Sequence, residues 1–249
     1  MSFDLKLHAY RLLMDEPFFA ALSRKIEKRE DRSIPTTGVC VNEQTGHFEM
    51  IYNPEFFASL PKEQVLGVLK HEYFHLIFEH CTSRRPVGVP HKTWNIAADL
   101  AINSHLVGEL PEFACMPGVG PFEELPAGMT AEWYLNNITD DQVDQCDGGE
   151  GEGQPGQPGV LDDHSGWSEE GDSEAQQAAN QMAKERLKQS LKEAAKEASQ
   201  SAKGWGSVSA GLKKEIIKRL ETKVDWRKVM RYFIKTSQRA NRSSTLKRI

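Results

Sequence analysis

The chain has 249 residues, of which 39% are hydrophobic and 27% charged, and its formal net charge is −5 at pH 7. This length can bury a sizeable core in one large or two small domains, and the composition is that of a globular protein carrying some disordered sequence. No segment has the apolar length of a membrane span, and the N-terminus lacks the apolar core of a signal peptide. The four cysteines are scattered without a CxxC pair, which argues against a disulfide framework or a thiolate zinc site and favours the reducing cytoplasm.

Charge is distributed unevenly along the chain. Residues 140–173 contain eleven acidic residues and no Lys or Arg, whereas residues 211–249 contain thirteen Lys or Arg and three acidic residues. A basic end of this kind can bind nucleic acid or meet an acidic protein surface. Because no nucleic-acid-reading motif is present, nucleic acid is not the expected partner.

The first half of the chain predicts helices around a short hairpin. Apolar residues recur at helical intervals in residues 2–31 and predict one or two amphipathic helices, with a break at Pro17. Residues 36–53 alternate in polarity around a turn at residues 42–46, which predicts an antiparallel hairpin. Two further helices are predicted at about residues 62–81 and 91–107.

The second half is more polar. A short helix is predicted to begin near Thr130. Helices are also predicted over residues 169–203, 207–221 and 225–235. Residues 140–160 are acidic and rich in Gly, Pro and Gln, so we expect a flexible insertion there. The predicted organisation is a core over residues 1–139, the insertion over 140–160, a returning loop and helical part of the same domain over 161–235, and a basic tail over 236–249.

The sequence HEYFH in the helix at residues 62–81 has the spacing of a metal site. Residues four apart share one face of a helix, so His71 and His75 can present both imidazoles to one ion, and Glu72 can reach a water bound to that ion. Zinc at such a site keeps an open coordination position, and Glu72 would be the general base acting on the zinc-bound water. The alternative is that both histidines are hydrogen-bonded residues of the core or its rim.

Asp99 is the candidate for a third ligand. It lies 24 residues after His75 on the next predicted helix, as the acidic ligand of gluzincins does, and neighbouring alanines would let the two helices approach closely. Asn95 and Asn103 flank it at i−4 and i+4, where they could hydrogen-bond the carboxylate or a histidine. His80 fits poorly as a ligand, because it lies half a turn round the helix from the first histidine. The alternative for Asp99 is a solvent-facing helix acid.

The segment LDDHSGW follows the acidic stretch and contains His164. We predict that His164 returns to the site, either as a fourth ligand or as a donor that stabilises the oxyanion. The alternative is a loop histidine beside Trp167, which would be a packing anchor.

Four segments together, HEYFH, HCTSRR, WNIAADLAIN and LDDHSGW, resemble the bacterial putative metallopeptidase domain family. Its members usually precede a von Willebrand A-like domain and are often encoded beside MoxR-type AAA ATPases. The resemblance implies a zinc-peptidase site at His71, Glu72, His75 and Asp99, with those two proteins as partners. The chain ends at Ile249, about where the von Willebrand-like domain would begin, so we expect a segment of a longer protein or a stand-alone form.

We therefore predict an α+β fold, mostly helical, with a zincin-like core and a small antiparallel hairpin sheet packed on the HExxH helix. The predicted function is that of a zinc metallopeptidase acting on a specific protein partner, with an extended peptide bound along the outer strand. The first alternative is a non-proteolytic, metal-containing adaptor module that works with an AAA ATPase. The second is a protease recruited to DNA through its basic end.

Overall fold

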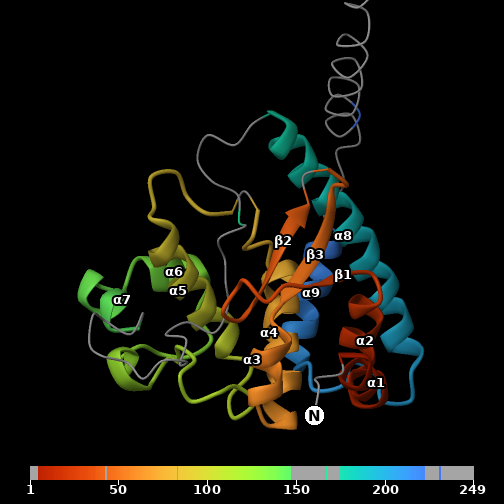
Figure 1. The fold of residues 1–249 in the computed structure, drawn as a ribbon, viewed down its shortest axis with the longest axis horizontal. Helices are drawn as coiled ribbons and strands as arrows, with labels where there is room; N and C mark the ends of the chain where they lie inside the picture. Colours follow the sequence, from red (N-terminus) through yellow and green to blue (C-terminus); the bar gives the residue numbers. More distant parts are fainter. Residues whose placement is uncertain are drawn as a thin grey trace, which may run out of the picture.

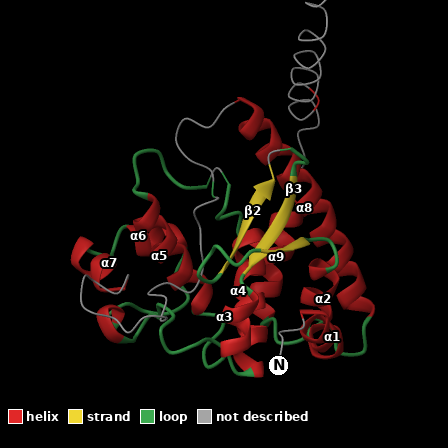
Figure 2. Cartoon of the chain, viewed as in Figure 1, coloured by secondary structure: helices red, strands yellow, loops and turns green. Residues whose placement is uncertain are grey.

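The computed structural model describes residues 5–42, 44–82, 84–146 and 174–221, together with Trp167 and Met230. These residues form a mixed fold of helices around one three-stranded sheet (Figures 1 and 2), which confirms the predicted α+β, mostly helical class. The described helices are α1 (Leu5–Asp15), α2 (Pro17–Ser23), α3 (Pro54–Ser59), α4 (Lys62–Ile77), α5 (His91–Asn103), α6 (Ala131–Leu135), α7 (Asp140–Cys146), α8 (Glu174–Gln200) and α9 (Ala210–Glu221), with a 3-10 turn at Gly120–Phe122.

The sheet has the strand order β1-β3-β2. Strands β2 (Thr37–Asn42) and β3 (His47–Tyr52) form the predicted antiparallel hairpin, with Val39 opposite Met50. Strand β1 (Glu27–Glu30) runs parallel to β3, so the sheet is mixed rather than purely antiparallel. The prediction of helix over this part of the N-terminal segment was wrong. The four residues EKRE are mostly exposed, and an exposed edge strand carries no alternating apolar pattern.

Helix α4 is the centre of the core. From Val65 to Ile77 every residue except Leu66 is buried, and the helix contacts β2, α1, α2, α5 and α8. Helix α5 is buried from Ile96 to Asn103. Both helices are shorter than predicted, because α4 ends at Ile77 and α5 at Asn103.

The remaining helices surround this pair on two sides. The long α8 runs beside β2 and β3 and packs on α2, whereas α5, α6 and α7 group together on the other side (Figure 1). Helix α8 is polar but buries the thin apolar stripe expected from its sequence. That stripe consists of Ala178, Ala179, Ala183, Leu187, Leu191, Ala194 and Ala198.

Two features of the segment between α5 and α7 differ from the predictions. Residues 140–146, expected to begin a flexible insertion, form α7, which buries Val143. A disulfide joins Cys146 at the end of α7 to Cys115 in the loop after α5, so the expectation against disulfides was wrong for this pair. The two cysteines lie 31 residues apart, a separation that no sequence pattern marks. Residues 147–160, the basic tail over 236–249, and the predicted helix at 225–235 apart from Met230 lie outside the described residues.

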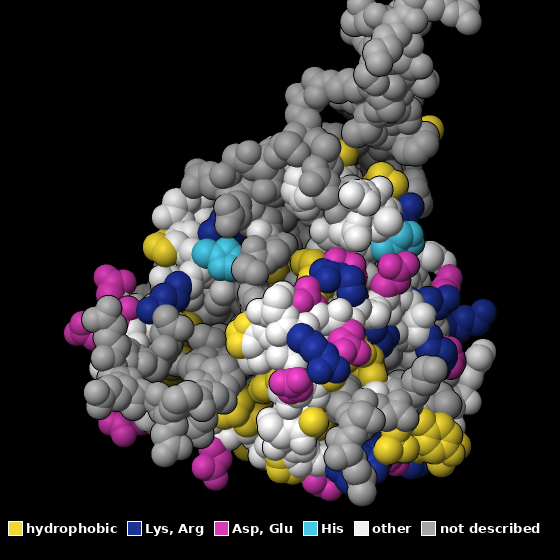
Figure 3. All heavy atoms as spheres, in the orientation of Figure 1, with side chains coloured by type: hydrophobic (Ala, Val, Ile, Leu, Met, Phe, Trp, Pro, Cys, Tyr) yellow, Lys and Arg dark blue, Asp and Glu magenta, His cyan; other side chains and the backbone are white. Residues whose placement is uncertain are grey.

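The surface carries charged side chains of both signs, interspersed over the face seen in Figure 3. Hydrophobic side chains gather over α1 in the same view, where Leu7, Tyr10 and Met14 are exposed at helical spacing. Among the described helices, none combines the length and the apolar character that crossing a lipid bilayer requires.

Candidate metal centre

Three buried side chains from two helices converge between α4 and α5. The Nε2 atoms of His71 and His75 lie 2.9 Å apart, and Asp99 Oδ1 lies 3.2 Å from His75 Nε2 and 3.8 Å from His71 Nε2. A tetrahedral zinc with bonds of about 2.0–2.1 Å separates neighbouring ligand atoms by roughly 3.3 Å. The three separations bracket that value, so these donors fit one divalent ion.

Local sequence explains why the donors meet. His71 and His75 are one helical turn apart and therefore share the face of α4 that meets α5. On α5, Ala97, Ala98 and Ala101 are all buried, and their small side chains let the two helices approach closely. Asp99 is 1% exposed, which excludes its alternative interpretation as a solvent-facing helix acid.

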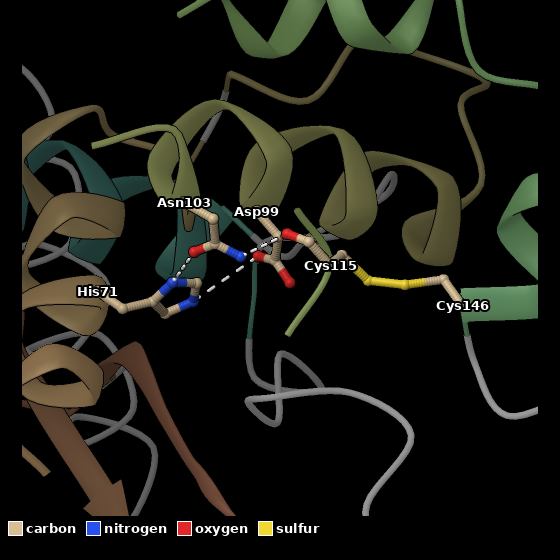
Figure 4. The surroundings of a disulfide bond; sticks show 5 residues. All are labelled: His71, Asp99, Asn103, Cys115 and Cys146. Atoms are coloured by element: carbon tan, nitrogen blue, oxygen red, sulfur yellow. Dashed lines mark hydrogen bonds and ion pairs between the residues drawn. A yellow bond between two sulfur atoms is a disulfide. The ribbon is translucent and has the colours of Figure 1, made fainter. Parts of the chain in front are cut away.

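Asn103 fixes the orientation of His71 (Figure 4). Its Oδ1 lies 2.7 Å from His71 Nδ1, and its Nδ2 donates to the carbonyl of Cys115 at 2.8 Å. An amide oxygen only accepts, so His71 Nδ1 carries the proton and the lone pair of Nε2 faces Asp99. The prediction that Asn103 hydrogen-bonds a histidine is thus confirmed. Asn95 instead lies 3.2 Å, through Nδ2, from Nδ1 of His91.

His80 lies beside His75 as Asn103 lies beside His71. Helix α4 ends in a Schellman-type turn, in which Glu79 has a φ of 60° and His80 N–H donates to the carbonyl of His75 at 2.9 Å. This turn returns the buried His80 side chain to the ligand helix, with the two Nδ1 atoms 3.3 Å apart. When His75 donates from Nδ1 to His80, its Nε2 lone pair is available to an ion.

Glu72 is fully buried but does not belong to the group of ligand atoms that could share an ion. Its carboxylate acts electrostatically on Cys40 of β2. Burial raises the pKa of the Cys40 thiol to about 12, with the negative charge of Glu49 adding to this shift and that of Glu72 contributing a smaller part. Glu72 thus lies between the candidate ligands of α4 and close enough to β2 to act on Cys40.

Comparison with known proteins gives the classification. The model of a family described as "Putative metallopeptidase domain" matches residues 2–248. The chain belongs to this family. A protein of Thermotoga maritima, described only as uncharacterized, is 33% identical over 70 residues, which make up 28% of this chain and 17% of that protein. The match therefore spans about a sixth of that relative's length. No solved structure matches the chain.

In this putative metallopeptidase domain, Trp167 covers the site on the side of the sheet. Its ring lies 4.9 Å from that of His75, and its Nε1 donates to the carbonyl of Val39 at 2.9 Å. The carbonyl of Thr36 accepts a hydrogen bond from the backbone N–H of Asn53 and therefore points toward β3. Backbone groups of successive residues in an antiparallel strand point alternately toward and away from the paired strand. The carbonyl of Val39, three residues later, therefore points away from β3. The indole therefore occupies the outer edge of β2.

Sequence analysis missed the position of His80 beside His75 and the hydrogen bond of Trp167 to β2. His80 was considered only as a ligand, and its place beside His75 depends on how α4 ends. The one feature of the sequence that could have indicated this position is that His80 follows His75 by only five residues, just past the HExxH segment. Trp167 was regarded as a packing anchor, and its hydrogen bond to β2 has no sequence signature. His164 lies outside the described residues.

Proposed function

We propose that this protein is a zinc-dependent metallopeptidase in which His71, His75 and Asp99 hold the ion and Glu72 is the general base. The observation that carries this proposal is the convergence of two imidazole Nε2 atoms and one carboxylate on a single buried point. Two imidazoles and a carboxylate leave zinc one coordination position for water or substrate. Membership of the metallopeptidase family supports a hydrolytic use of that position.

When bound, zinc supplies Lewis-acid chemistry: it lowers the pKa of water and polarises a carbonyl group. Glu72 takes a proton from the attacking water and passes it to the leaving amine. Asn103 and His80 hold the two imidazoles with their Nε2 lone pairs directed inward. Because these groups are enclosed, their charges interact more strongly than they would in water. His164, which lies outside the described residues, stays a prediction as a fourth ligand or as a donor to the oxyanion.

The proposed substrate is an extended segment of a specific protein. In a zincin-like arrangement it adds as a strand to the outer edge of β2, where backbone groups such as the carbonyl of Val39 point away from β3. Trp167 holds that carbonyl and packs on His75, so the substrate must displace the indole. This requirement favours restricted proteolysis of one partner over general digestion.

A second candidate function is a non-proteolytic adaptor with a structural metal, which works with a MoxR-type AAA ATPase and a von Willebrand A-like domain. The observation that favours it is the complete burial of His71, Glu72 and His75, each 0% exposed. Structural zinc sites are closed, whereas catalytic sites keep access to solvent.

The substitution Glu72→Gln separates the two functions. Under the peptidase proposal the variant keeps the wild-type zinc content, measured by atomic emission, and loses cleavage of an unstructured protein by about 10²–10⁴-fold. Glu79→Gln is the matched control, because Glu79 follows the same helix, pairs with Lys184 and has a side chain that is 45% exposed. Undiminished cleavage by Glu72→Gln would rule out Glu72 as the general base. Zinc binding without cleavage by wild type, with cellular function retained in Glu72→Gln, would establish the adaptor.

A further inference from the structure

A disulfide is connected to the candidate metal ligand His71 through direct contacts of Cys115 and Asn103 (Figure 4). Cys146 is bonded to Cys115, whose carbonyl accepts a hydrogen bond from Asn103 Nδ2 at 2.8 Å. The Oδ1 atom of Asn103 lies 2.7 Å from His71 Nδ1. The cross-link therefore holds the residue that orients the amide, and the amide orients the imidazole.

The amide of Asn103 has no freedom to turn while both contacts are made. Its side chain is fully buried, with the nitrogen donating to Cys115 and the oxygen accepting from His71. If the Cys115 carbonyl moves away, the amide loses the acceptor that distinguishes its two ends. If the amide turned over, its N–H group would point at His71 Nδ1, which would then have to accept. The imidazole would carry its proton on Nε2 instead, and the lone pair that faces Asp99 would be lost.

Besides the disulfide, α7 is held by its packing on α5 and on the 3-10 turn and by a few side-chain contacts. Val143 is the one buried residue of this helix, and an exposed ion pair of 3.0 Å joins Asp144 to Lys92. Gln142 Nε2 donates to the carbonyl of Pro121 at 2.7 Å. The disulfide is the covalent link between α7 and the Cys115 segment, so its loss leaves their relative position to these noncovalent contacts alone.

We propose that the Cys115–Cys146 disulfide is a redox control of the metal centre, and that its reduction lowers the affinity for zinc through Asn103. This inference rests on the metal site of the proposed function and adds its regulation. The reductant is a dithiol, whose thiolate attacks the half-buried Cys146 sulfur to form a mixed disulfide. The second thiol of the reductant then displaces Cys146. The dithiol is oxidised to its own disulfide, and Cys115 and Cys146 each end as a protonated thiol.

The test measures zinc affinity by competition with a chromophoric chelator. Wild-type protein is compared before and after reduction by a phosphine, which avoids a zinc-binding thiol in the assay. Thiol titration of the denatured protein should give two thiols before reduction, from Cys40 and Cys81, and all four afterwards. Reduction is expected to weaken zinc binding by about tenfold or more, the size of effect seen when a group that orients a ligand is lost. Reoxidation with oxidised glutathione should restore the original zinc affinity.

Two variants locate the effect. Cys146→Ser should have the affinity of the reduced protein and should not respond to the phosphine. Asn103→Ala should also lower affinity, and adding Cys146→Ser to it should cause little further loss, because both changes act through one path. If the losses of zinc affinity caused by the two substitutions were fully additive, the disulfide would not act through Asn103.

The outcomes distinguish this inference from the metal site itself. Equal zinc affinity in the oxidised and reduced states, with binding still abolished by His71→Ala, overturns the redox control and leaves the metal centre standing. Four thiols in protein purified without reductant and treated with oxidised glutathione also overturn it. Zinc binding absent from wild type in both states overturns the metal centre, and the redox control with it.

Discussion

His71 and His75 occupy successive turns of α4, but their Nδ1 atoms have partners of different chemistry. Asn103 Oδ1 can only accept, so it fixes the tautomer of His71 outright. His80 can accept a hydrogen bond from His75 through Nδ1 only when the imidazole of His80 carries its own proton on Nε2. At the scale of single residues, His75 is therefore the less firmly oriented of the two imidazoles, and its orientation depends on a residue outside the helix.

The substitution His80→Ala tests this dependence. We expect zinc affinity to fall about 10–100-fold, because His75 loses the acceptor that holds its Nδ1 proton. His80→Asn should retain part of the affinity, since its side-chain oxygen can accept in place of the imidazole. Competition titration against a chelator measures both.

His105→Ala is the matched control for this series. His105 also packs against Phe78, at 6.3 Å between ring centroids, but it does not belong to the group of candidate ligands. The zinc affinity of this variant should equal that of wild type. Wild-type affinity in His80→Ala would show that His75 needs no such partner.

Trp167 gives a second prediction at the residue scale. Trp167→Ala removes the ring that packs on His75, so a chelator should extract zinc severalfold faster than from wild type. Trp167→Phe keeps a ring but loses the donor to Val39, and its extraction rate should lie between the two. Stopped-flow measurement with a coloured chelator gives these rates. Identical rates in all three proteins would mean that the indole does not limit access.

At the scale of elements, success of prediction depended on whether an element buries a periodic apolar face. Helix α4 and the β2–β3 hairpin do so, and both were predicted close to their observed bounds. Strand β1 and helix α7 bury almost nothing, so local pattern could not reveal them. The meeting of His71, His75 and Asp99 could be anticipated because it follows from spacing on two helices. The position of His80 could not, since it depends on the left-handed conformation of Glu79.

Gly67 in α4 marks a close approach between elements. A Cβ built on it would lie 2.0 Å from the carbonyl oxygen of Glu109, which is main chain and cannot rotate away. Gly67→Ala should therefore destabilise the protein, because an overpacking cost of about 1–3 kcal/mol exceeds a helix-propensity gain of about 1 kcal/mol or less. Urea denaturation measures the change.

Gly211→Ala in α9 is the matched control. It is also a helical glycine, but a Cβ added to it would meet nothing within 4 Å. The free energy of unfolding should stay unchanged or rise by up to about 1 kcal/mol. Equal effects of the two alanines would contradict the close approach at Gly67.

At the scale of the whole molecule, Lys70 joins three parts of the chain that are distant in sequence. Its Nζ forms an ion pair with Glu16 between α1 and α2 at 3.4 Å and a hydrogen bond to Ser207 before α9 at 3.3 Å. It also pairs with Glu109 in the loop after α5. The Lys70 side chain is 4% exposed and directly precedes His71, so this junction anchors α4 beside the metal centre.

Lys70→Ala leaves the carboxylates of Glu16 and Glu109 without their cation. Loss of one partner from a buried pair costs about 3–5 kcal/mol, and we expect a destabilisation of that order in chemical denaturation. Lys203→Ala is the control, because its pair with Asp15 is more than half exposed on both sides and should contribute at most about 1 kcal/mol. Similar losses in the two variants would contradict the importance of the buried junction.

The enclosure of the three donor side chains has a consequence for how the protein acquires its metal. His71, His75 and Asp99 are at most 1% exposed, so an ion can cross to them only during a transient opening of the fold. Metal content is then governed by kinetics as well as by affinity. A molecule loaded while its chain is folding keeps its ion when that ion later becomes scarce, and one that folds empty fills slowly even when the ion is abundant.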